Sequence, residues 1–243
     1  MTTGRIHSWD LSTGVDGPGT RFVLFLSGCQ LRCLYCANPD TWHMRDGQQV
    51  TVDEVVGRIE RYRQFTTLAG GGVTLTGGEP LLQSAFTAEV FRRCKELGLH
   101  TALDTSGALG TRTDDALLAD TDLVLLDIKS FDAGVYRRLT GGGHLAPTLN
   151  FATRLNRLGV PTWIRYVLVP GWTDDPAAID GLGRFLAELD NVDRVDVLPF
   201  HKLGTHKYDS LGIPFPLRDN PVPDAALVER VRDQFRAHGL RAH

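Results

Sequence analysis

The stretch that decides the fold is Phe22-Val23-Leu24-Phe25-Leu26-Ser27-Gly28-Cys29-Gln30-Leu31-Arg32-Cys33-Leu34-Tyr35-Cys36. Its apolar first third predicts a buried β-strand that ends at the Ser-Gly pair. Three cysteines follow at the spacing Cys-x3-Cys-x2-Cys. An odd number of cysteines cannot form a closed set of disulfides, whereas three thiolates on one loop can hold a metal. The stretch therefore predicts a strand that runs directly into a metal-binding loop.

Two kinds of metal site fit this loop. A structural zinc site needs four ligands, and His43 or a more distant residue could complete it. A 4Fe–4S cluster is normally held by four thiolates, so three would leave one iron without a protein ligand. An open iron can bind a substrate or cofactor, as an open zinc position does. The loop alone leaves both sites open.

Length and composition are those of an ordinary globular protein. The 243 residues, 42% hydrophobic and 23% charged, suffice for one core, so we expect one domain over residues 1–243. A net charge of -3 gives no reason to expect a nucleic-acid or membrane partner. The chain shows no signal-peptide core and no apolar run long enough to span a bilayer. Clustered cysteines favour the reducing cytoplasm, and Cys94, inside a helical pattern, is expected to be a buried thiol.

Apolar runs and helical periodicity alternate along the chain. Strands are expected at 21–28, 72–76, 100–104, 122–129, 162–169 and 195–199. Helices are expected at 52–62, 81–97, 113–119, 131–139, 148–158, 176–189 and 224–238. This alternation predicts an α/β fold with a parallel sheet. Six units are too few for an eight-fold barrel, and both a doubly wound open sheet and a partial six-strand barrel fit the pattern.

Polar or special residues follow the expected strands at their carboxyl ends, where parallel barrels place active sites. They are Cys29, Gly77-Gly78-Glu79-Pro80, Asp104-Thr105, Asp127-Ile128-Lys129, Arg165 and His201-Lys202. The paired glycines would let the backbone approach a ligand closely. Asp104 and Asp127 either cap helices or converge on a cation. Arg165 interrupts an apolar strand and is expected to meet a buried anion.

The cysteine loop, followed by a Gly-Gly-Glu-Pro motif behind a strand, resembles the radical S-adenosylmethionine (SAM) enzymes. The resemblance implies a partial (β/α)6 barrel, with core strands over about 21–202 and a last helix at about 224–238. It implies a 4Fe–4S cluster on Cys29, Cys33 and Cys36. The open iron would bind SAM, whose reductive cleavage gives a deoxyadenosyl radical.

The same resemblance implies the cofactor contacts. The SAM-binding residues would be Tyr35, Cys36, Ala37, Gly77, Gly78, Glu79, Asp104, Asp127, Ile128, Lys129, Arg165 and His201. A monovalent cation, K+ or Na+, would be held by Asp104, Thr105, Asp127 and a carbonyl near Leu125. Ala37 departs from the family, where histidine often follows the third cysteine, so any contact of that side chain is lost.

Other segments resemble the activating enzymes of glycyl radical enzymes in particular. They are residues 4–8, 15–21, 29–39, 70–74, 163–172 and 198–204, whereas 210–223 match poorly. The resemblance implies that the radical removes a hydrogen atom from a glycine of a partner enzyme, with Asp16 gripping the partner and flavodoxin or ferredoxin supplying the electron. No cysteine lies between Cys36 and Gly77, so the chain is the short form without a ferredoxin-like insert. This favours pyruvate formate-lyase as the partner of a monomeric activase.

Three other functions stay open. The chain could activate another glycyl radical enzyme, act on a small molecule, or be a non-catalytic metal-cluster protein. The chain ends soon after the sixth expected strand, which favours an open barrel mouth and a protein substrate.

Overall fold

The computed structural model describes residues 2–243. The chain packs into two compact units. The first comprises the chain up to Gln30, Asp40–Thr105 and Leu109–Leu125, and the second comprises Leu31–Pro39, Ser106–Ala108 and Leu126–His243. In residues 2–243, no helix combines the length and apolar character that crossing a membrane requires.

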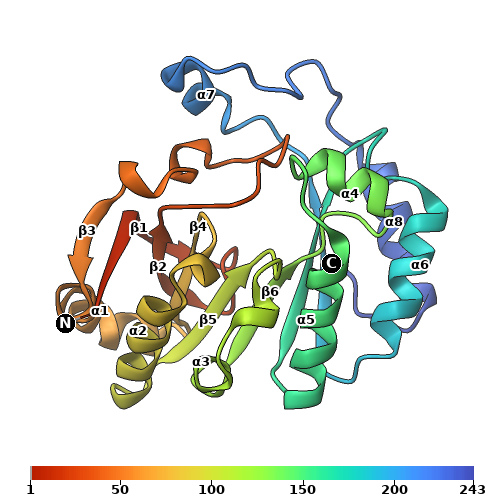
Figure 1. The fold of residues 1–243 in the computed structure, drawn as a ribbon. Coiled ribbons are helices and arrows are strands. Elements are labelled where there is room, and N and C mark those ends of the chain that lie inside the picture. Colours follow the sequence, from red (N-terminus) through yellow and green to blue (C-terminus); the bar gives the residue numbers. More distant parts are fainter. Residues whose placement is uncertain (1) are drawn as a thin grey trace. The chain divides into compact units, whose positions relative to one another are not determined.

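Strands and helices alternate along most of the chain (Figure 1). The strands are β1 Thr3–Thr13, β2 Thr20–Leu26, β3 Gln48–Thr51, β4 Gly72–Gly77, β5 His100–Thr105, β6 Leu123–Asp127, β7 Thr162–Leu168 and β8 Val192–Pro199. The α-helices are α1 Val52–Leu68, α2 Ser84–Glu96, α3 Asp115–Ala119, α4 Ala133–Leu139, α5 Leu145–Leu158, α6 Pro176–Ala187, α7 Thr205–Leu211 and α8 Ala225–Ala237. The six strands and seven helices expected from the sequence are all present, with ends shifted by a few residues.

The first unit contains the strands in the order β3-β1-β2-β4-β5-β6. β2, β4 and β5 pair in parallel and in chain order, without the reversal that marks a doubly wound sheet. Val73 and Leu75 on β4 are fully buried, as expected for a parallel strand covered on both faces. Helix α1 packs on β2 and β4, and α2 packs on β5 and α1 (Figure 1). α1 begins at the Thr51–Glu54 capping box.

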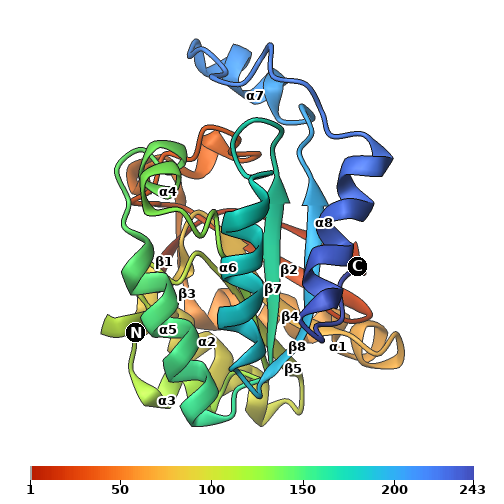
Figure 2. The ribbon, with the colours of Figure 1, turned by 90° about the vertical axis from the view of Figure 1, so that its right-hand side faces the viewer.

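In the second unit, β7 and β8 lie side by side and parallel, with α6 and α8 packed against each other beside them (Figure 2). The buried Tyr166 ring on β7 meets Phe235 on α8 edge to face, with ring centroids 5.7 Å apart. The chain end continues this packing, because Ala242 bridges Val195 on β8. α8 and the C-terminal residues thus hold the outer side of the last parallel pair.

The sequence analysis did not predict β1, β3 or α7. β1 pairs antiparallel with β2 and β3, and its register shifts between Ile6 and Ser8, which breaks the alternation that sequence reasoning looks for. Along β1 only Gly4 and Ile6 are buried. α7 has seven residues with a single buried side chain, Tyr208, so no helical periodicity can show.

Candidate active site

The first cysteine is held by main-chain hydrogen bonds where β2 ends. The Gly28 N–H donates to the Thr41 carbonyl at 2.7 Å, and the Cys29 N–H donates to the Trp42 carbonyl at 3.0 Å. Gly28 has a φ of +99°, and a Cβ there would lie 2.7 Å from the Met44 Cε. Only glycine fits this turn without strain. Cys29, half-buried and in no disulfide, therefore sits on a well-anchored loop start.

The Gly-Gly-Glu motif packs against the same loop start. The Gly78 N–H donates to the Leu26 carbonyl and the Glu79 N–H donates to the Gly28 carbonyl, both at 2.8 Å. A Cβ on Gly78 would lie 2.2 Å from the Gly28 oxygen. The sequence predicts that the two glycines allow close approach of a ligand, but the neighbour in the structure is the backbone of the cysteine loop. The motif ties the end of β4 to the start of that loop.

Hydroxyl groups hold two carboxylates at the ends of β4 and β5. Glu79 is 1% exposed, and its Oε1 accepts hydrogen bonds from the Thr105 hydroxyl at 2.6 Å and the Leu81 N–H at 3.1 Å. The Asp104 Oδ2 accepts from the Thr76 hydroxyl at 2.6 Å. These bonds fix both carboxylates in place, and a cation-binding role of Asp104 and Thr105 stays a prediction.

The alternative role as helix caps is wrong for both predicted aspartates. Helix α3 is capped by Asp114, whose carboxylate accepts from the Ala116 N–H, and not by Asp104. Helix α4 is capped by Asp132, and not by Asp127. The two strand-end carboxylates are therefore available for roles other than capping.

Asp16 lies in the turn before the amino end of β2, whereas Cys29 follows the carboxyl end of that strand. The main-chain carbonyl of Asp16 accepts a hydrogen bond from the Thr74 hydroxyl at 2.7 Å. Thr74 and Thr76 share one face of β4, because side chains two residues apart in a strand point the same way. Thr76 binds Asp104. The turn thus lies on the face of β4 from which Thr76 reaches Asp104 on β5, displaced from Thr76 by roughly 7 Å toward the amino end of β4.

In the second unit, main-chain hydrogen bonds also hold the other two cysteines. The Leu34 N–H donates to the Leu139 carbonyl at 2.8 Å, and the Cys36 N–H donates to the Cys33 carbonyl at 3.1 Å. Burial raises the pKa of the Cys33 thiol to about 11. Without a metal this thiol is protonated at neutral pH, and a bound metal ion would displace the proton.

The tyrosine between these cysteines has a buried hydroxyl. Tyr35 Oη has no hydrogen-bond partner among residues 2–243, and burial raises the pKa of the phenol well above its usual value. The Lys129 ammonium lies 5.7 Å from the centre of the Tyr35 ring, within cation–π range. A buried polar atom without a partner leaves room for a ligand contact, which agrees with the predicted place of Tyr35 beside SAM.

Two cationic side chains surround Asp127. The Lys129 Nζ lies 2.6 Å from Asp127 Oδ2, and the Arg165 Nε lies 3.9 Å from Asp127 Oδ1. Burial lowers the pKa of Lys129, but Asp127, Tyr35 and Cys33 together raise it further, so that pKa stands well above its usual value. The anionic neighbour expected for Arg165 is therefore Asp127. A monovalent cation at Asp127 would compete with a charge already present.

The remaining predicted residues differ in burial. Ile128 is buried, and its N–H donates to the Arg165 carbonyl at 3.1 Å. His201 and Ala37 are exposed. A Cβ on Gly204, next to α7, would lie 2.9 Å from the Ala37 carbonyl oxygen, so this glycine allows close packing on the cysteine loop.

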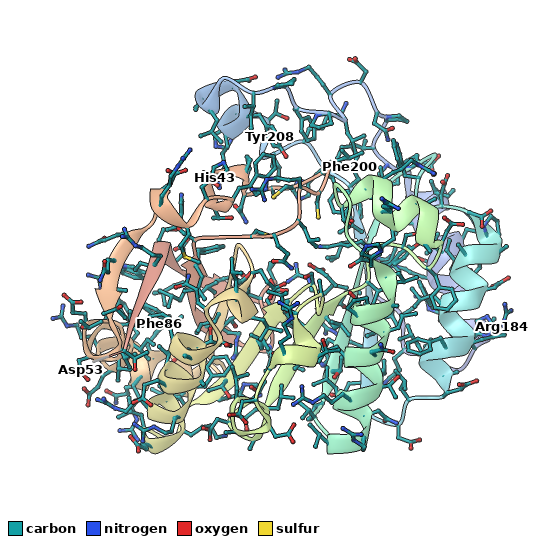
Figure 3. The ribbon with its side chains drawn as sticks, in the orientation of Figure 1. His43, Asp53, Phe86, Arg184, Phe200 and Tyr208 are labelled. Carbon is teal, nitrogen blue, oxygen red and sulfur yellow. The ribbon has the colours of Figure 1, made fainter. Side chains whose placement is uncertain are left out.

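The side chains that anchor the cysteine loop and the Asp16 turn were not predicted from the sequence. Tyr208 on α7 is 1% exposed, and its hydroxyl donates to the Cys36 carbonyl at 3.1 Å (Figure 3). Arg21 and Thr74 hold the Asp16 turn in the first unit. Tyr208 and Cys36 are 172 residues apart, and no local pattern signals such a contact.

The chemistry of the donor set fits an iron–sulfur cluster. Cys29, Cys33 and Cys36 form no disulfide, are half-buried, and supply the soft sulfur ligands that such clusters take. His43, the alternative zinc ligand, is exposed (Figure 3). Among residues 2–243 no group of three or more His, Cys, Asp or Glu side chains is arranged to hold a metal ion. The three cysteines thus stay predicted cluster ligands, on their spacing and chemistry.

Comparison with known proteins identifies the family. Residues 23–180 match the model of the radical SAM superfamily. A pyruvate formate-lyase-activating enzyme of Staphylococcus aureus is 46% identical over 236 residues, which cover 94% of each chain.

Solved structures agree with this assignment. A domain of a pyruvate-formate lyase-activating enzyme from Bacteroides vulgatus has a TM-score of 0.60 and 27% identity over 71% of this chain and 98% of its own. A radical SAM methyltransferase from Sphaerobacter thermophilus has a TM-score of 0.66 at 19% identity, over 100% of this chain and 76% of its own, and supports the fold alone. The predicted radical SAM type of α/β fold is confirmed. The chain therefore belongs to the radical SAM superfamily and, within it, to the pyruvate formate-lyase-activating enzymes.

Proposed function

We propose that this protein activates pyruvate formate-lyase by removing one hydrogen atom from a backbone glycine of that enzyme, which leaves a glycyl radical. The observation that carries the proposal is 46% identity to a pyruvate formate-lyase-activating enzyme over 94% of both chains. The Cys-x3-Cys-x2-Cys loop that the family requires is present. When bound, a 4Fe–4S cluster and SAM supply the hydrogen-abstracting radical.

The residues of this chain bind and orient the reactants. Cys29, Cys33 and Cys36 would ligate the cluster. The SAM-binding residues we propose are Tyr35, Cys36, Ala37, Gly77, Gly78, Glu79, Asp104, Asp127, Ile128, Lys129, Arg165 and His201. Hydrogen-atom abstraction needs no general base, so these side chains position the reactants and exclude water.

Asp16 would grip the partner loop that carries the glycine. The support is its position on the face of β4 from which Thr76 binds Asp104. We further propose a flavodoxin or ferredoxin as electron donor, a monomeric protein with one radical SAM domain, and the reducing cytoplasm as its compartment.

The proposal also includes a monovalent cation at Asp104, Thr105 and Asp127. Lys129 already lies 2.6 Å from Asp127 and would compete with it. If Asp127 is a cation ligand, Lys129→Met should strengthen the stimulation of SAM binding by K+ or Na+, and Asp127→Asn should abolish it. Equal salt responses of the wild type and both variants would exclude the cation.

The decisive experiment mixes the anaerobically reconstituted protein with SAM, a reductant and pyruvate formate-lyase, and records the electron paramagnetic resonance spectrum. We expect a glycyl radical signal and matching deoxyadenosine. A formate-lyase whose radical-bearing glycine is replaced by alanine is the control. SAM cleavage without a glycyl radical on the formate-lyase would overturn the proposed partner, and zinc without sulfide in the purified protein would overturn the cluster.

A further inference from the structure

Arg21, at the start of β2, is a completely buried arginine. Its guanidinium donates to the Thr74 hydroxyl at 2.7 Å, to the Val73 carbonyl at 2.6 Å and to the Pro18 carbonyl at 3.2 Å. Burial lowers the pKa of Arg21 to about 10, although Asp122 raises it in part. The side chain is thus charged at neutral pH. Arginine is almost never fully buried without a specific reason.

Thr74 connects this buried charge to the Asp16 turn. Its hydroxyl oxygen accepts from Arg21 Nε and its hydroxyl hydrogen is donated to the Asp16 carbonyl, each at 2.7 Å. Together with the bond from Arg21 to Pro18, two successive parts of the turn are tied to the same buried pair. A hydroxyl can accept one hydrogen bond and donate another at the same time, whereas valine, which has the same shape as threonine, can do neither.

The turn is also confined by close packing against the segment that precedes β4. Gly19 has a φ of +67°, and a Cβ there would lie 2.4 Å from the Gly70 main chain. Gly17 has a φ of +118°, which side chains rarely allow. The Gly14 N–H donates to the Gly19 carbonyl at 3.0 Å and closes the turn. The backbone thus permits one arrangement, and the Arg21–Thr74 pair selects its position on β4.

We propose that Arg21 and Thr74 are positioning residues that hold the Asp16 turn on the face of β4 that Thr74 and Thr76 share, so that the turn can receive the glycine loop of the partner protein. We call this pair the Arg21–Thr74 latch. The proposal rests on the proposed function. It means that the buried pair Arg21 and Thr74 supports binding of the protein substrate by positioning the turn. Residues at the carboxyl ends of the strands would bind SAM.

The test replaces Thr74 by valine, which keeps the shape and removes the hydroxyl. Thr74→Ser keeps the hydroxyl and is the rescue variant. The matched control is Thr121→Val, because Thr121 is also buried and donates its hydroxyl to a main-chain carbonyl, that of Leu117, at 2.8 Å. Thr121→Val loses one buried hydrogen bond, whereas Thr74→Val loses the bond from Arg21 and the bond to the Asp16 carbonyl, so only Thr74→Val touches the turn.

The functional readout is glycyl radical formation at varied concentrations of formate-lyase, with partner-free SAM cleavage measured in parallel. Because misplacement by about 1 Å can cost on the order of 100-fold in rate, we expect Thr74→Val to raise the KM for the partner at least about tenfold. Partner-free deoxyadenosine formation should match that of Thr121→Val, and Thr74→Ser should restore the KM. An unchanged KM, or an equal loss of partner-free cleavage, would overturn the latch.

Hydrogen exchange of residues 14–19 in the isolated protein tests the latch without any activity. Loss of the hydrogen bond to the Asp16 carbonyl should speed exchange about fivefold or more in Thr74→Val, and not in Thr121→Val or Thr74→Ser. If the wild type makes no glycyl radical while exchange behaves as expected, the proposed function fails and the latch stands as an anchor of the turn. Equal exchange in all variants would overturn the latch itself.

Discussion

Replacing Tyr208 by phenylalanine would remove one hydrogen bond and little else. The hydroxyl donates to the Cys36 carbonyl at 3.1 Å. The ring keeps its contact with Phe215, whose centroid is 4.9 Å away. Such a bond contributes about 1 kcal/mol to the free energy of unfolding, and about 1 kcal/mol is roughly a fivefold change in an equilibrium constant. We therefore expect the peptide of the third cysteine to be released about five times more often.

Tyr166→Phe is the matched control for this change. Tyr166 is also 1% exposed, and its hydroxyl donates to the Thr173 carbonyl at 2.7 Å. In urea unfolding of the metal-free protein, both variants should lose about 1 kcal/mol of stability. After cluster reconstitution, iron loss to a chelator should be about fivefold faster in Tyr208→Phe than in the wild type. Tyr166→Phe should lose iron at the wild-type rate.

The two measurements separate the possible failures. Equal iron loss in Tyr208→Phe and the wild type, with the expected loss of stability, would mean that α7 is anchored to the loop without holding the cluster ligand. Faster iron loss in both variants would mean that general destabilisation releases the cluster. Either result would refute the inference that Tyr208 stabilises the third ligand.

Further changes test the ligands, the motif packing and the response to pH. Cys33→Ser should abolish iron binding, since a hydroxyl is a poor ligand for iron–sulfur centres. Cys94→Ser should keep full iron content, because Cys94 is fully buried in α2 and burial raises the pKa of its thiol to about 12. Iron analysis of the two purified variants measures both outcomes. Gly78→Ala would place a Cβ 2.2 Å from the Gly28 oxygen and should lower the free energy of unfolding. Gly57→Ala in α1, where nothing lies within 4 Å, should raise it by ~1 kcal/mol, and the loss in Gly78→Ala should be several times larger than this gain. An unfolding midpoint of Gly78→Ala equal to that of the wild type would contradict the packing. Burial, then repulsion by Arg21, lowers the pKa of His100 below its usual 6.5, so the unfolded chain binds more protons below that pH and stability should fall as pH drops from 6.5 through the lowered folded-state pKa. In urea titrations at several pH values, His100→Gln should flatten this dependence of the free energy of unfolding on pH. The lowered pKa of Asp122 affects stability only below pH 3.8, its usual pKa, so it does not contribute in this range.

The sequence predicted the parts of the fold that carry a local signal. Each parallel strand is an apolar run, and the buried Leu123–Asp127 strand lies within the expected 122–129. The buried thiol of Cys94 is confirmed for the same reason, because one short segment determines it. The strands at the antiparallel edge were missed, because their residues are half-exposed and their register shifts once.

Long-range contacts explain why the site was predicted only as a set of residue types. Spacing alone singles out the cysteines, but it cannot show that Tyr208 holds Cys36 or that Arg21 and Thr74, 53 residues apart, share a hydrogen bond. It also cannot show that the backbone of the cysteine loop packs against Gly78, since a glycine pattern shows that space is needed and not what occupies it.

The residues that would bind SAM and the residues that anchor the loops, Arg21 and Tyr208, attach to different parts of the chain. The side chains that the family resemblance assigns to SAM lie at strand ends or in the cysteine loop, apart from Arg165 within β7. The anchors Arg21 and Tyr208 are themselves fully or almost fully buried, and both act on main-chain carbonyls of a loop. A main-chain carbonyl keeps its hydrogen-bonding capacity whatever side chain the loop carries. Loop residues such as Ala37 can therefore differ between relatives while the path of the loop is preserved. On this reasoning the buried anchors set the geometry of the site, and the exposed loop side chains are the positions at which partner specificity can change.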